Sequence, residues 1–152
     1  MSENDLQIFG IVHGSVGAAL LALLVLSAWL DRRGETEAFG TGLMIVSVMQ
    51  ILQGVFGFVL HGHYETRLRR LLFLRAPAIG WWLERKEHIA IGALALTWCA
   101  LAAHLASRRA DAELRERFAK AASWAARAAA LCSLLAFTIG VTVAAAMMQI
   151  LR

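Results

Sequence analysis

Four of the five histidines stand close to glycines in otherwise apolar stretches of the chain. His13 lies in GIVHGSVG, His61 follows Gly57 in VFGFVLHGHYE, and His88 precedes Gly92 in a later stretch. Imidazole is a good ligand for iron, copper or zinc, and glycine beside histidine leaves room for something large and flat. The pattern therefore raises the hypothesis of a bound cofactor, provided that the surrounding elements bring the histidines together.

Those elements are long apolar blocks, with most charges gathered between them. The chain has 152 residues, of which 59% are hydrophobic, and the blocks are residues 8–30, 39–61, 88–107 and 121–151. The first block has 23 residues without a charge, and as a helix it would rise roughly 34 Å, enough for a hydrocarbon core of about 30 Å. We expect an all-α integral membrane protein with one domain, 1–152, in which four transmembrane helices run up-down-up-down.

The connecting segments refine this arrangement. The short polar turn after residue 30 makes the first two helices antiparallel neighbours. In the longer second connection, TRLRRLLFLR alternates basic and apolar residues, which predicts a short amphipathic helix at the membrane surface. The charged segment RRADAELRERFAK is a helix former that should extend the third or the fourth helix. Both termini then lie on one side of the membrane, called side A; the opposite side is side B.

This topology gathers His13, His61, His88 and also His63 near side A, whereas His104 lies toward side B as an isolated interfacial histidine. Each of the first three shares a helical stripe with the smallest residues of its own helix. Small residues let neighbouring helices approach closely. We therefore expect these three histidines to face one interior space.

The first hypothesis for that space is a b-type haem. His13 and His61 are the preferred axial ligands, because their helices must be neighbours, and His88 is the alternative ligand. The porphyrin would lie against glycines of the first two helices, and its propionates would reach basic residues at the headgroup level. The residues expected to contact this cofactor are Gly10, Gly14, Gly54, Gly57, Arg67 and Arg70.

Two other interpretations stay open. The three histidines could bind a transition metal together with an oxygen from Glu65, Glu84 or Glu87, or they could bind nothing and form hydrogen bonds between helices. Gln50 and Gln53, near the middle of the second helix, would either bond between helices or meet a quinone.

Three function classes follow from these interpretations. The first is a membrane electron-transfer protein or anchor subunit that exchanges electrons with quinone. The second is a non-enzymatic assembly factor, transporter or accessory subunit, in a larger complex or a homo-oligomer. The third is a metal-dependent membrane enzyme, so the sequence leaves open whether the chain is an enzyme.

Charge and cysteine content restrict the partners and the location. The net charge is +4, but the basic segments are broken by acids and carry no known nucleic-acid motif, so the expected partner is the lipid bilayer. Basic residues are divided equally between the two sides, which leaves the orientation undecided. We expect an inner membrane of bacterial type. Cys99 and Cys132 lie in apolar blocks and are expected to be small buried residues rather than a disulfide.

Overall fold

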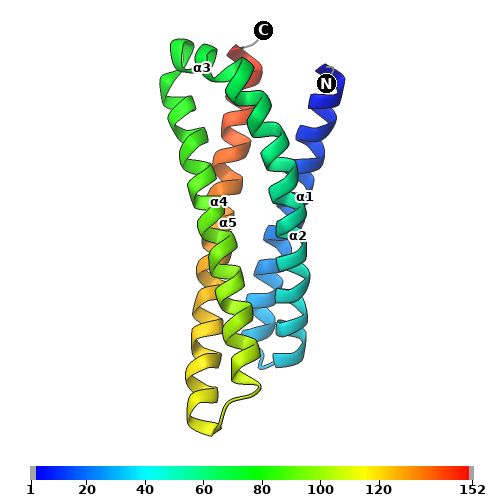
Figure 1. Ribbon diagram of the computed structural model, residues 1–152, viewed down its shortest axis with the longest axis vertical. Coiled ribbons are helices and arrows are strands. Elements are labelled where there is room, and N and C mark those ends of the chain that lie inside the picture. Colours follow the sequence, from blue (N-terminus) through cyan, green and yellow to red (C-terminus); the bar gives the residue numbers. More distant parts are fainter. Residues whose placement is uncertain (1–2, 151–152) are drawn as a thin grey trace.

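The computed structural model describes the backbone of residues 3–150, and the side chains of residues 8–149 except Arg67. This part of the chain is helical throughout, with short turns and no strand (Figure 1). Its elements are α1 (Glu3–Arg32), α2 (Thr36–His63), the π-helical turn η1 (Tyr64–Leu68), α3 (Arg69–Arg75), α4 (Pro77–Ser107) and α5 (Ala112–Ile150).

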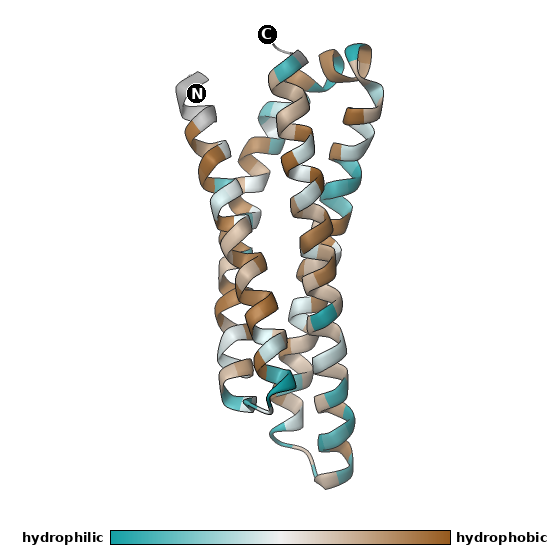
Figure 2. Ribbon diagram, turned by 180° about the vertical axis from the view of Figure 1, so that it is seen from behind, coloured by the Kyte–Doolittle hydropathy of each residue, from teal (hydrophilic) through white to brown (hydrophobic). Residues whose placement is uncertain are grey.

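Four of these helices are long and apolar enough to cross a membrane, as the sequence predicts. Their candidate spans are Ile8–Arg32, Thr36–Thr66, Pro77–Ser107 and Ala112–Gln149. Figure 2 shows the most hydrophilic residues concentrated toward the two ends, with apolar residues along the shafts. Large apolar side chains also point outward; Phe58 is 79% exposed and Trp124 is 69% exposed. Such surfaces are compatible with contact to lipid.

The four long helices form a ring in which α1 packs on α2 and α5, and α4 packs on α2 and α5. In Figure 1 the start of α1, the end of α5 and the short helix α3 lie at one end, which we call side A. The turns between α1 and α2 and between α4 and α5 lie at the other end, side B. The first of these turns reverses at Gly34, whose φ of 78° favours a residue without a Cβ.

Two helices start earlier than the apolar blocks suggest. Helix α4 begins at Pro77, and proline suits a first helical position because it has no N–H to leave unpaired. The charged segment between the last two blocks is mostly the start of α5, where Asp111 Oδ1 accepts a hydrogen bond from the Leu114 N–H at 3.0 Å. His88 consequently lies well inside a helix, with three turns between it and the helix start.

A short helix does occupy the connection between α2 and α4. It is α3, and it folds back onto α4, with Leu72 buried and the Phe73 ring pressed against Gly80. A side chain at Gly80 would collide with that ring, so the glycine permits this close approach.

The interior is packed unevenly along its length. Toward side B, one buried cluster contains Phe39, Leu43 and Ala100, and a second contains Leu24 and Val46. On the side-A halves of α1 and α2, none of the residues 8–19 or 48–63 is buried. Side B therefore holds both clusters, and the side-A halves of α1 and α2 are more loosely packed. Toward side A the buried residues of the described part lie on α4, α5 and the connection between α2 and α4, for example Gly80, Ala136 and Val143.

His104 belongs to the packed half. It is only 3% exposed, it meets the Phe39 ring edge-on with 5.5 Å between ring centroids, and it fills the space beside Gly40. His104 lies in the last turn of α4 toward side B, as expected. Its side chain is buried rather than surface-facing, because the glycine on α2 leaves room for the imidazole inside the bundle.

Candidate functional site

The shortest contact of a histidine with an acid joins α2 to α4 near side A. His61 Nδ1 lies 2.8 Å from Glu87 Oε1, while the other ring nitrogen, Nε2, is 3.8 Å from Glu65 Oε1. An acceptor at Nδ1 favours the tautomer that carries its hydrogen there and leaves a lone pair on Nε2. A histidine oriented in this way by a carboxylate is the usual arrangement of a metal ligand.

A second ionic group lies beside this pair and joins η1, α3 and α4. Arg69 donates to Glu84 Oε1 from Nε at 3.1 Å and from Nη2 at 3.0 Å, and it contacts Glu65 Oε2 at 3.4 Å. The hydrogen bonds with Glu84 raise the pKa of Arg69. The guanidinium is therefore committed to two carboxylates of the chain itself.

His13 lies deeper in the side-A half, on α1 against α2. The Gln53 amide donates to the His13 carbonyl oxygen at 2.9 Å, and its Nε2 is 3.4 Å from the ring Nε2. A Cβ on Gly57 would be 3.4 Å from His13 Cε1. Since Gly57 is one helical turn from His61, the rings of His13 and His61 occupy successive levels along α2.

Several polar atoms in this region have no hydrogen-bond partner among the described residues. They include the ring nitrogen Nδ1 of His13, the amide oxygen of Gln53 and the hydroxyl of Tyr64, all of them buried. Buried polar atoms are normally hydrogen-bonded, so this group of unpaired atoms is an unusual feature of the side-A half. It marks the region as a candidate binding site.

His88 is placed differently from the expectation. It is exposed, and its Nδ1 lies 2.9 Å from the Glu84 carbonyl oxygen of its own helix. Ala95, Cys99 and Ala102 on the same stripe are exposed as well. The small-residue stripe of α4 therefore faces outward, because α4 turns its Ala93, Thr97 and Ala100 face to the bundle.

Of the four glycines predicted to contact the cofactor, only one lies beside a histidine ring. Gly57 lies beside His13, but Gly10, Gly14 and Gly54 are exposed, with open space where a Cβ would be. Of the two predicted arginines, Arg70 is exposed on α3, and the side chain of Arg67 lies outside the described residues.

The metal hypothesis asked for three histidines around one ion. Among the described residues, no group of three or more His, Cys, Asp or Glu side chains is arranged to hold a metal. His13 and His61 are brought to neighbouring levels of the α1–α2 pair, whereas His88 is not. Cys99 is exposed and Cys132 half-buried, without a disulfide, so the expectation that both are buried holds only in part.

A separate polar group near side B joins α1 to α5. Ser123 donates to Asp31 Oδ2 at 2.6 Å, and Arg127 Nη2 donates to the same oxygen at 3.2 Å. The cation inside the last apolar block thus has a carboxylate partner.

Gln50 was expected to bond between helices or to meet a quinone. It donates a hydrogen bond to Thr97 Oγ1 on α4 at 3.1 Å, and its amide oxygen is among the unpaired buried atoms.

Sequence reasoning underrated two residues of the side-A region, Lys86 and Glu87. Both lie in ERKEH, which resembles a solvated connection when the helix is expected to begin at His88. The proline at position 77 followed by an unbroken helical run was the available signal. This signal would have placed Lys86 and Glu87 on the third long helix, where they can face the neighbouring helices.

Comparisons with protein-family models, curated proteins and solved structures find no match for this chain.

Proposed function

We propose that the chain is a membrane electron-transfer protein or anchor subunit that binds one b-type haem in its side-A half, where His13 and His61 would hold the group. The proposal is carried by the hydrogen-bond partners of the imidazole nitrogens of His61 and His13. His61 is oriented by Glu87 through Nδ1, and His13, on the neighbouring helix, has a buried Nδ1 without a described partner. When bound, haem iron would supply reversible one-electron transfer.

The surrounding residues fit such a group. Glu87 would hold the His61 ring and raise its basicity as a ligand. Gly57 lets the His13 ring lie close to the backbone of α2, where a Cβ would be 3.4 Å from its Cε1, and residues 8–19 and 48–63 of α1 and α2 include no buried residue. Tyr64 and Gln53 offer polar atoms that still lack partners.

In the same proposal the four long helices cross a bacterial-type inner membrane up-down-up-down, and α3 lies amphipathically at the headgroup level on side A. The apolar outward surface supports contact with the lipid bilayer, and the arginines and tryptophans near α3 are typical of a membrane interface. Because His61 and Glu87 lie near that end, a cofactor there would be within reach of a partner in solution or in the membrane.

The test is an absorption spectrum of the native protein, purified in detergent after expression with ample haem. We expect a Soret band with the sharpened reduced bands of a six-coordinate b-type haem, and its loss in His61→Ala and in His13→Ala. A native protein without visible absorption would remove the haem proposal.

The exposed stripe of α4 favours a second candidate, an accessory subunit of a larger membrane assembly or of a homo-oligomer. Gly92, Ala95 and Cys99 offer a surface against which another helix could approach closely. Oxidative cross-linking through Cys99 in native membranes would support it by giving a dimer that a Cys99→Ala variant does not give.

A further inference from the structure

Lys86 is a cation in an apolar helix whose acidic neighbours already have other partners. Glu87 is bonded to His61, and Glu84 is bonded to Arg69. Lys86 itself forms no ion pair or hydrogen bond with any residue that the structure describes, and it is not exposed. An ionisable side chain within a membrane span is costly, and where one occurs it usually serves a function.

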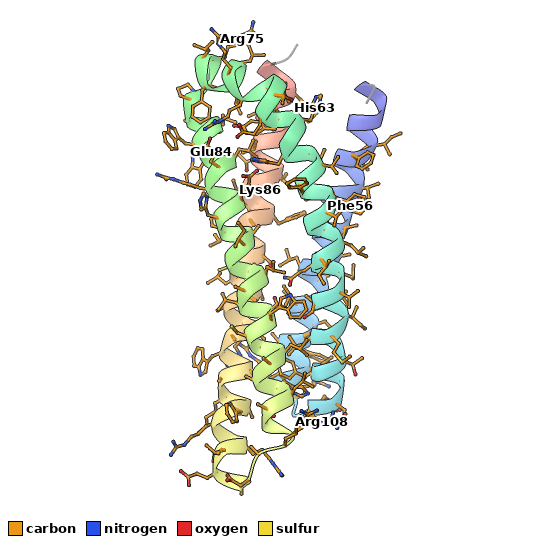
Figure 3. The ribbon with its side chains drawn as sticks, in the orientation of Figure 1. Phe56, His63, Arg75, Glu84, Lys86 and Arg108 are labelled. Carbon is orange, nitrogen blue, oxygen red and sulfur yellow. The ribbon has the colours of Figure 1, made fainter. Side chains whose placement is uncertain are left out.

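The side chain is directed into the bundle. Its Cε and Nζ atoms lie 3.4 and 3.5 Å from the position of a Cβ on Gly140 of α5. Figure 3 labels Lys86 between the ribbons in the side-A half, below Glu84. The ammonium group therefore lies against α5, toward the interior of the bundle rather than the lipid.

Polar side chains in the same half have buried atoms without a hydrogen-bond partner among the described residues. These atoms include the amide oxygen of Gln53 and Nδ1 of His13. Gly57 and Gly140 let His13 and Lys86 approach the backbones of α2 and α5, because a Cβ at either glycine would lie 3.4 Å from the nearest atom of that side chain. Leaving a half-buried ammonium group without an anionic partner is unfavourable. A ligand that brings an anionic oxygen would accept hydrogen bonds from Lys86, whereas the Gln53 oxygen, itself an acceptor, can be paired only by a donor.

We infer that Lys86 binds the carboxylate of an amphipathic ligand whose apolar body lies between the helices in the side-A half. A carboxylate matches this site because one ammonium group balances one negative charge. Phosphate is recognised more often by forked arginine donors, and Arg69 is already occupied by Glu65 and Glu84. The carboxylate could come from a haem propionate, which rests on the proposed function, or from a free fatty acid.

The experiment compares acids with their uncharged counterparts on the full-length protein in detergent. The probes are haem against haem dimethyl ester, and lauric acid against dodecanol, titrated by tryptophan fluorescence and, for haem, by absorption. We expect the native protein to bind at least one acid about tenfold or more tightly than its counterpart, as for a charge-assisted hydrogen bond. Lys86→Gln should abolish this difference, and Lys86→Arg should keep part of it.

The matched control is Arg85→Gln. Arg85 is the neighbouring cation, exposed, with its guanidinium carbon 5.8 Å from the centroid of the Trp82 ring. This variant should preserve the preference for the acid. Equal binding of acid and counterpart by the native protein, for both pairs of probes, overturns the inference without any variant having to fold, and so does a preference that survives in a folded Lys86→Gln protein.

The two ligand sources give different results. A preference for haem over its ester that depends on Lys86 supports the propionate. If haem fails to bind but lauric acid is preferred over dodecanol in a Lys86-dependent manner, the haem proposal fails while the carboxylate site stands.

Discussion

Glu87 on α4 holds the ring of His61 on α2, with 2.8 Å between Oε1 and Nδ1. This contact joins the side-A end of the α2–α4 pair, while His13 approaches α2 from α1 one turn deeper. The relationship makes Glu87 a positioning residue for any ligand bound by His61. His88 lies on the same helix as Glu87, but its side chain faces outward.

The first prediction concerns this pair. Glu87→Gln removes the charged acceptor but keeps the side-chain size, and we expect it to weaken haem affinity by about 10- to 100-fold, as for other residues that orient a metal ligand. The dissociation constant is measured by haem titration of the apo-protein. His88→Ala is the control and should leave both affinity and spectrum unchanged. A lost Soret band in His88→Ala would contradict the choice of ligands.

The second prediction uses two glycines of one helix. Gly57→Leu places a large side chain against His13, whereas Gly54→Leu extends into open space. We expect Gly57→Leu to displace the cofactor and to lower the intensity of the Soret band, while Gly54→Leu retains it. Circular dichroism of both proteins checks that they are equally helical. If Gly54→Leu alone lost the cofactor, the site would lie on the other face of α2.

The third prediction tests the membrane topology. In a background without Cys99 and Cys132, single cysteines replace the exposed residues Glu35, Ala112 and Arg70. A membrane-impermeant maleimide applied to oriented vesicles should label the first two from one side and Arg70→Cys from the other, because the two turns lie at the end opposite α3. Labelling of Glu35→Cys and Ala112→Cys from opposite sides would disprove the arrangement.

The apolar blocks were sufficient to predict four long helices, because lipid requires a backbone that bonds within its own segment. They were not sufficient to orient each helix. A stripe of small residues such as Gly92, Ala95 and Cys99 fits a helix contact or a lipid surface equally well, and the contacts of α4 with its neighbours decide between them. The stripe of α2 turns only partly inward: Ser47 is buried and Gly57 half-buried, but Gly54 is exposed.

Side-chain pairing was also beyond a reading of one sequence. Arg127 could be recognised as a cation inside an apolar block, but its partner Asp31 is distant in the chain and close only because α1 packs on α5. His61 and Glu87 are joined in the same way across α2 and α4. Long-range pairs of this kind depend on helix rotation, which the pattern of apolar residues determines only loosely.

The last prediction concerns the stability of the α1–α5 contact at side B. Asp31→Asn removes the charge that Arg127 and Ser123 share, and Arg127→Met removes the guanidinium. Each should lower the free energy of unfolding by about 1.5–3 kcal/mol, the range for hydrogen bonds to a charged group. The double variant should lose less free energy of unfolding than the sum of the two single losses, because the first change already breaks the interaction.

The corresponding double-mutant cycle for the exposed pair Glu113 and Arg117, joined at 2.7 Å, is the control, with an expected coupling energy of about 0.3–0.5 kcal/mol. Denaturant unfolding in mixed micelles, followed by tryptophan fluorescence, measures all of these values. Strictly additive losses at Asp31 and Arg127 would mean that the two side chains do not interact across α1 and α5.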